Sequence, residues 1–154
     1  MKLNKYIQKS CCFYASDWHL TVMLLPYINN KVQENCSIYM KCENNIEEKM
    51  NILLNKLTLK NKKNIMNINW KNSVAEDETD TNKEKIYIVS GNDAYIKNIN
   101  NLIEQCYGEK NYKIKIINCY EVKESDNLGK IIKENGYTQI LNTKGECDIE
   151  KMIL

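Results

Sequence analysis

Short apolar segments of strand length alternate along this chain with longer segments of helical periodicity, and this alternation is the strongest constraint on its fold. The strand-like segments are predicted at 10–15, 36–40, 64–69, 86–89, 113–120 and 139–141. The helices are predicted at 18–32, 46–57, 94–106 and 125–135, and for the short tail at 147–154 a helix is one option. We therefore predict an α/β fold with three layers, in which helices cover both faces of a mostly parallel central sheet, as in Rossmann-like domains.

The length of 154 residues predicts one domain, 1–154. Between 71 and 84 the composition becomes acidic and polar, with almost nothing to bury, and we predict a flexible acidic loop there. This loop lacks the Asp/Asn spacing and the central glycine of a calcium-binding loop, so no metal is expected in it.

The turns after the predicted strands do not carry nucleotide-binding motifs. The first strand leads into Ala15-Ser16-Asp17-Trp18-His19, which has neither the glycines nor the lysine of a phosphate-binding loop. The turn at 90–93 contains one glycine, and ordinary turn and cap chemistry accounts for it. We therefore predict a Rossmann-like domain without a P-loop and without a bound cofactor.

Charge and hydropathy exclude several classes of partner. The formal net charge is only +2, every basic residue is a lysine, and no DNA- or RNA-reading motif is present, so nucleic acid is not expected as a partner. The longest apolar run, 20–28, is too short to span a bilayer, and no signal peptide is apparent. These features predict a cytoplasmic protein with no membrane association.

Seven cysteines raise the question of metal binding or thiol chemistry. Their number is odd and no C-x-x-C spacing occurs, so disulfides and a zinc site are not expected, and most of the thiols are expected to be small buried side chains. An enzyme or redox protein that uses Cys11, Cys12 or Cys119 remains an alternative, because a thiol with a lowered pKa would be nucleophilic.

In open α/β sheets, ligands bind at the carboxyl ends of the strands. The residues at or near the predicted strand ends are therefore the candidate lining of a ligand site, with no catalytic role assigned to any of them. These residues are Cys12, Tyr14, His19, Gly91, Asn92, Cys119 and Tyr120.

A resemblance to a known family is carried by the segments 11–17, 24–28, 36–39, 95–103, 113–120 and 128–141. Taken together, these segments resemble the MEDS family, the sensory domain of the methanogen/methylotroph DcmR type. Family members carry a histidine where this chain has Lys9, and the acidic residue after the late tyrosine is present as Glu121. The helical middle of the family domain is missing, and the acidic segment at 75–82 could be its remnant.

The resemblance implies a RecA-like core without ATP-hydrolysis motifs that senses small molecules. Our first hypothesis is accordingly a non-catalytic sensory or regulatory domain, truncated and divergent from MEDS, that binds a small-molecule ligand or a regulatory protein partner. The alternatives are the thiol-based enzyme or redox protein and a protein-interaction scaffold that could form a homodimer.

Overall fold

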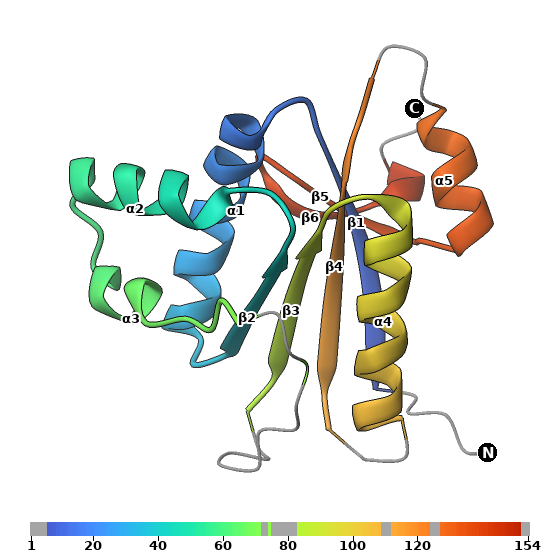
Figure 1. The fold of residues 1–154 in the computed structure, drawn as a ribbon, viewed down its shortest axis with the longest axis horizontal. Helices are drawn as coiled ribbons and strands as arrows, with labels where there is room; N and C mark the ends of the chain where they lie inside the picture. Colours follow the sequence, from blue (N-terminus) through green and yellow to red (C-terminus); the bar gives the residue numbers. More distant parts are fainter. Residues whose placement is uncertain (1–5, 72–73, 75–82, 109–111, 124–126, 152–154) are drawn as a thin grey trace.

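The structure is a computed structural model that describes residues 6–71, 74, 83–108, 112–123 and 127–151. Six strands and five α-helices alternate through these residues, followed by a short 3-10 helix (Figure 1). The strands are β1 (Ile7–Tyr14), β2 (Ser37–Cys42), β3 (Lys85–Ser90), β4 (Ile114–Glu121), β5 (Gln139–Asn142) and β6 (Gly145–Asp148). The helices are α1 (Asp17–Gln33), α2 (Ile46–Lys56), α3 (Lys62–Met66), α4 (Asp93–Tyr107), α5 (Leu128–Asn135) and the 3-10 helix η1 (Ile149–Lys151).

The six strands form one sheet in the order β2-β3-β4-β1-β5-β6, and only the β5–β6 pair is antiparallel. This confirms the predicted α/β fold with a mostly parallel central sheet. The central pair is β1 and β4, which run in register over eight positions from Ile7↔Ile114 to Tyr14↔Glu121. The order differs from the 3-2-1-4-5-6 order of dinucleotide-binding domains.

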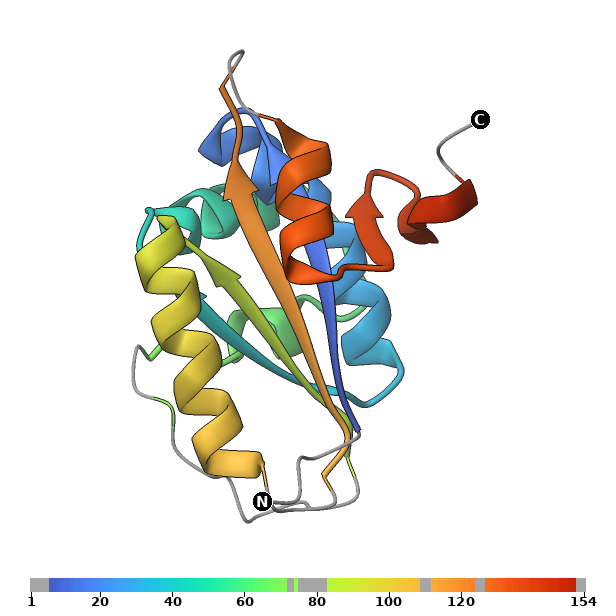
Figure 2. The same ribbon diagram turned by 90° about the vertical axis from the view of Figure 1, so that its right-hand side faces the viewer.

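Helices cover both faces of the sheet, as the alternation predicts (Figures 1 and 2). Helices α1, α2 and α3 pack on one face, here called the α1 face, and α4 and α5 pack on the other, here called the α4 face. Because successive strand residues point to opposite faces, Cys12 belongs to the core under α1 whereas its neighbour Cys11 belongs to the core under α4.

Helix α1 begins where its sequence predicts. The Ser16 hydroxyl accepts a hydrogen bond from the His19 backbone N–H, which otherwise has no partner in the first turn. Pro26 lies inside the helix, and α1 continues through it without being split. At the other end of the chain, Gly136 adopts the left-handed conformation after α5 with φ +67°, as expected for a glycine in that position.

One sequence prediction is wrong. Residues 64–66 of the strand predicted at 64–69 belong to the helix α3, and Asn69 makes a single parallel bridge, to Tyr39. A short apolar run with Asn on both sides fits a helical turn as well as a strand, so its pattern could not decide between them. The tail at 147–154, for which a helix is one option, begins as part of β6 at 145–148, and the described residues that follow, 149–151, form the 3-10 helix η1.

Two further predictions concern segments that are only partly described. Residues 72–73 and 75–82, the main part of the predicted acidic loop, lie outside the described residues. The predicted start of the helix at 125–126 also lies outside them, and the described helix α5 is capped by the Asn127 side chain, which accepts from Lys130 N–H at 3.1 Å.

Candidate functional site

The carboxyl ends of β1, β2 and β3 meet in a network of polar side chains around Asn44. The Asn44 amide donates to Asp17 Oδ1 at 2.9 Å and to the Tyr14 hydroxyl at 3.3 Å. Its carbonyl oxygen accepts a hydrogen bond from the Ser90 hydroxyl at 2.5 Å. This network ties the loops that follow three strands together, so the edge predicted to bind a ligand is filled by contacts within the protein.

Gly91 and Asn92 lie in the same edge, at the turn from β3 to α4. The Asn92 side chain caps α4 by accepting from the Tyr95 N–H at 2.7 Å, and the Asn92 N–H donates to Glu43 Oε1 at 2.8 Å. A Cβ on Gly91 would lie 2.5 Å from Glu43 Oε1 and 2.7 Å from the Tyr95 ring. The glycine is therefore required by the close approach of these two side chains.

We expect Gly91→Ala to lower the free energy of unfolding by about 1–3 kcal/mol, because the methyl group would overpack the turn against Glu43 and Tyr95. Gly129→Ala is the matched control, since only the Asn127 side chain, at 3.4 Å, is near a Cβ built there. Alanine is the better helix former, so Gly129→Ala should be neutral or stabilising. Urea unfolding of both variants measures the difference, and equal stability of the two would contradict this account.

The seven candidate residues are not brought together by the fold. Cys12, Tyr14 and Cys119 are buried on the α1 face, whereas Tyr120 is buried on the α4 face. His19 lies on α1 and is exposed, and its Nδ1 accepts a hydrogen bond from the Ala15 N–H at 2.8 Å. Tyr120 follows Cys119 directly on β4, and successive side chains of a strand point to opposite faces of the sheet. The sheet therefore separates Tyr120 from Cys12, Tyr14 and Cys119.

The three thiols proposed as nucleophiles are fully buried in the middle of the sheet. Cys12 and Cys119 are paired in register on β1 and β4, and Cys11 precedes them on the opposite face. Burial, with the neighbouring Cys12 thiol as a smaller cause, raises the pKa of Cys11 from 9.0 to about 12. Burial also raises the pKa of Cys119 well above its usual value. These shifts disfavour the thiolate that a nucleophile needs.

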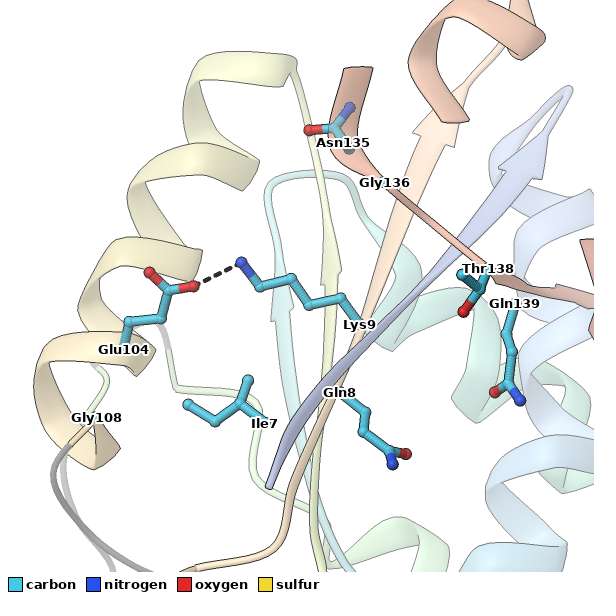
Figure 3. Close-up of a pocket in the computed structure, with 9 residues that line it drawn as sticks. All are labelled: Ile7, Gln8, Lys9, Glu104, Gly108, Asn135, Gly136, Thr138 and Gln139. Carbon is cyan, nitrogen blue, oxygen red and sulfur yellow. Dashed lines mark hydrogen bonds and ion pairs between the residues drawn. The ribbon is translucent and has the colours of Figure 1, made fainter. Parts of the chain in front are cut away.

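A cleft of about 540 Å³ opens on the α4 face between β1, the end of α4 and the start of β5 (Figure 3). Lys9 projects across it from β1, and its ammonium contacts Glu104 on α4 at 2.6 Å. The lining consists of Ile7, Gln8, Lys9, Glu104, Gly108, Asn135, Gly136, Thr138 and Gln139. Most of these residues carry polar side chains, so the cleft offers hydrogen bonds in addition to the apolar parts of its lining.

A second cavity of about 240 Å³ shares Lys9 and Asn135 with this cleft. It is bordered by four side chains that we call the amide–phenol network, namely Asn100, Asn118, Tyr120 and Tyr137. The two asparagines exchange hydrogen bonds at 2.8 and 3.1 Å, and Asn118 also donates to the Tyr137 hydroxyl at 2.8 Å. The Tyr137 hydroxyl in turn lies 2.6 Å from that of Tyr120. We call the two adjoining cavities the α4–α5 groove.

Of the candidate ligand-site residues predicted from the sequence, only Tyr120 borders this groove. A signal was present in α4, where Asn100 occupies an inward position between Ile96 and Ile103. Asn118 is a comparable signal, because it interrupts the apolar run of β4. Lys9 gave no signal, since a lysine at the start of a strand is usually exposed.

Other kinds of site find no support in the described residues. No group of three or more His, Cys, Asp or Glu side chains in this part of the chain could hold a metal ion. No described helix has the length and apolar character needed to cross a membrane.

Comparison of the chain with family models, curated proteins and solved structures finds no match. The resemblance to the MEDS family therefore stays a prediction from the sequence segments that carry it.

Proposed function

We propose that this chain is a non-catalytic sensory or regulatory domain that binds a small molecule, as the resemblance to MEDS domains implies. The observation that carries the proposal is the α4–α5 groove, whose two cavities of about 540 and 240 Å³ adjoin at Lys9 and Asn135. Small-molecule sites have volumes of about 300–1,000 Å³. The groove has that size, and its lining combines apolar surface with polar side chains that could fix the orientation of a ligand.

The ligand site predicted from the sequence lies at the carboxyl edge of the sheet, but that edge is filled by the protein's own contacts. This favours the α4–α5 groove as the ligand site. Four helices begin at that edge, and three of them, α1, α4 and α5, are capped by the chain's own Ser16, Asn92 and Asn127 side chains. The first turns of α1, α4 and the remaining helix, α2, carry acidic side chains and place negative charge there. An anionic ligand such as a nucleotide phosphate would meet capped N–H groups and like charge at this edge.

A screen of metabolite pools by thermal shift tests the proposal, because a ligand that binds the folded state raises the melting temperature. Thr138 is exposed on the wall of the groove, and Thr138→Trp should fill part of it and abolish the shift. Thr58→Trp changes an exposed threonine outside the groove and should retain it. If no pool raises the melting temperature, or if the hit binds Thr138→Trp equally well, the proposal is wrong.

The alternative of a thiol enzyme makes an opposite prediction for the buried cysteines. We expect Cys11, Cys12 and Cys119 to react with iodoacetamide only at the rate of global unfolding, because all three side chains are 0% exposed. Peptide mapping by mass spectrometry after a time course at neutral pH measures each site. Fast labelling of any of the three in the folded protein would restore the thiol hypothesis.

A protein partner is the second candidate, and it is favoured by apolar side chains on the surface of α1. Trp18 and Val22, one helical turn apart, are 44% and 55% exposed. A second copy of the chain or a regulatory protein could cover them. Light scattering over a range of concentrations tests the homodimer, which Trp18→Glu should dissociate, and a monomer at all concentrations would exclude it.

A further inference from the structure

The amide–phenol network leaves one hydroxyl proton without a hydrogen bond to a described residue. Asn100 donates its two amide hydrogens to Ile96 O and Asn118 Oδ1, and Asn118 donates its two to Asn100 Oδ1 and the Tyr137 hydroxyl. Tyr120 and Tyr137 then share one hydrogen bond, for which only one of their two protons is needed. The other O–H makes no hydrogen bond with the described residues.

This spare donor belongs to a buried side chain at the wall of a cavity. Tyr120 and Tyr137 are 8% and 7% exposed, and both border the smaller cavity of the α4–α5 groove. An O–H group that is shielded from bulk water loses free energy unless an acceptor is supplied. A molecule in the cavity that supplies an acceptor oxygen would therefore complete the hydrogen bonding of the network.

Lys9 adds further donors at the junction of the two cavities. Its ammonium has three N–H groups, and the described residues supply one acceptor, Glu104. The side chain is 37% exposed and borders both cavities, so a ligand in either of them can reach it. The phenol and the ammonium thus present hydrogen-bond donors to one space.

The charge of the groove selects among anions. The charged side chains that line the two cavities are Lys9, Lys97 and Glu104. Lys9 is paired with Glu104, and Lys97 is paired with Asp93 at 2.9 Å, so the two ion pairs have no net charge. A monocarboxylate adds one negative charge to this neutral lining, whereas a phosphate monoester adds about 1.5 to 2 negative charges at pH 7. The uncharged side chains of Gln8, Thr138 and Gln139 in the larger cavity can hydrogen-bond polar groups on the rest of the ligand.

We infer that the α4–α5 groove binds a small monocarboxylate, whose oxygens accept hydrogen bonds from the spare phenol O–H and the Lys9 ammonium. This inference rests on the proposed function and names the chemical class of its ligand. The polar side chains of the larger cavity favour a hydroxylated or amide-bearing acid over a purely aliphatic one.

The test is a titration of the full chain with lactate, 3-hydroxybutyrate and benzoate, each paired with its neutral amide, and with glycerol phosphate. We expect a carboxylate to raise the melting temperature by several degrees at about 100 times its Kd. The matching amide and the phosphate ester should give a smaller shift. An amide or a phosphate ester that binds as tightly as the best carboxylate would overturn the inference.

Substitutions of the groove residues test whether the carboxylate binds in the α4–α5 groove. Lys9→Met should weaken carboxylate binding about tenfold or more, Lys9→Arg should preserve it, and Lys56→Met, which removes an exposed lysine of α2, should leave it unchanged. Tyr120→Phe combined with Tyr137→Phe removes the spare O–H and should also weaken binding, with circular dichroism to verify that the variant folds. Unaltered affinity in Lys9→Met would overturn the inference.

These experiments distinguish failure of the carboxylate inference from failure of the proposed small-molecule function. If another class of metabolite gives a shift that Thr138→Trp abolishes and no carboxylate does, the carboxylate inference is wrong and the proposed function stands. If no compound of any class binds, the proposed function is wrong as well.

Discussion

Glu146→Gln is expected to lower the free energy of unfolding by about 3–5 kcal/mol, because it leaves the Lys115 ammonium buried without a counter-charge. Glu146 on β6 pairs with Lys115 on β4, and the two side chains are only 15% and 11% exposed. Glu146 also accepts a hydrogen bond from the Tyr27 hydroxyl of α1 at 2.7 Å. This carboxylate therefore connects β6, β4 and α1 at one point in the interior.

Chemical denaturation at neutral pH measures the loss, and a surface ion pair provides the control. Lys97 and Asp93 are 2.9 Å apart on α4, with side chains 68% and 64% exposed, and Asp93→Asn should cost less than about 1 kcal/mol. The double variant Glu146→Leu with Lys115→Met should regain much of the stability, because apolar side chains of similar volume often replace a buried ion pair without loss. Equal effects of Glu146→Gln and Asp93→Asn would contradict a buried pair.

The same residues show why β6 could not be predicted from the sequence. The segment Gly145–Asp148 has no apolar alternation and little β-branched character, so it has no strand signal of its own. It pairs with β5 through a tight connection, and Glu146 is held by partners 31 and 119 residues away in sequence. Contacts over such separations are tertiary, and local pattern does not contain them.

Buried lysines are a second feature that the sequence could not reveal. Lys41 and Lys85 are 1% and 0% exposed, on neighbouring strands at positions that a strand pattern would give to apolar residues. Both ammonium groups lie 5.9 Å from the centroid of the Tyr39 ring, which is itself stacked on Tyr87. Burial lowers the pKa of Lys41, whose ammonium donates to the Lys71 carbonyl oxygen. From sequence alone such lysines are assigned to the surface.

The strands β3 and β4 and the second half of β1 could be predicted because each is mainly a run of apolar residues that is buried on both faces. The order of the strands in the sheet could not be predicted from the sequence, and neither could the groove that depends on it. The α4–α5 groove combines β1, α4 and the segment after α5, which only the crossover from β4 past β1 to β5 brings together. The rule that ligands bind at strand ends located Tyr14 and Asn92 correctly at the carboxyl edge, but the protein fills that edge with its own hydrogen bonds.

Loss of stability at alkaline pH is the second large effect that we expect. The pKa of Cys11 is raised from 9.0 to about 12 in the folded chain, mainly by burial. Above pH 9 the unfolded chain therefore releases a proton that the folded chain keeps, and the free energy of unfolding falls as the pH rises toward 12. One such group costs about 1.4 kcal/mol per pH unit over this window.

Other buried acids act in the same direction. Burial raises the pKa of the Cys119 thiol and of the phenols of Tyr14, Tyr27 and Tyr87. Each phenol begins to contribute when the pH passes the usual tyrosine value of 10.0. With several groups in play, the free energy of unfolding at pH 11 should be lower than at pH 8 by more than about 4 kcal/mol, which is a large part of the stability of an ordinary domain.

Urea unfolding between pH 7 and pH 11 measures this dependence, and Cys11→Ala separates one group from the rest. The packing lost in Cys11→Ala lowers stability at every pH, so it cancels when the slopes of the variant and the parent chain are compared. Between pH 9 and pH 11 the slope of the variant should be shallower by about 1.4 kcal/mol per pH unit, because the titrating thiol is gone. Identical slopes would mean that Cys11 ionises equally well in the folded and unfolded chains. The thiol would then be accessible to solvent in the native state, and the argument against a cysteine nucleophile in the centre of the sheet would fail with it.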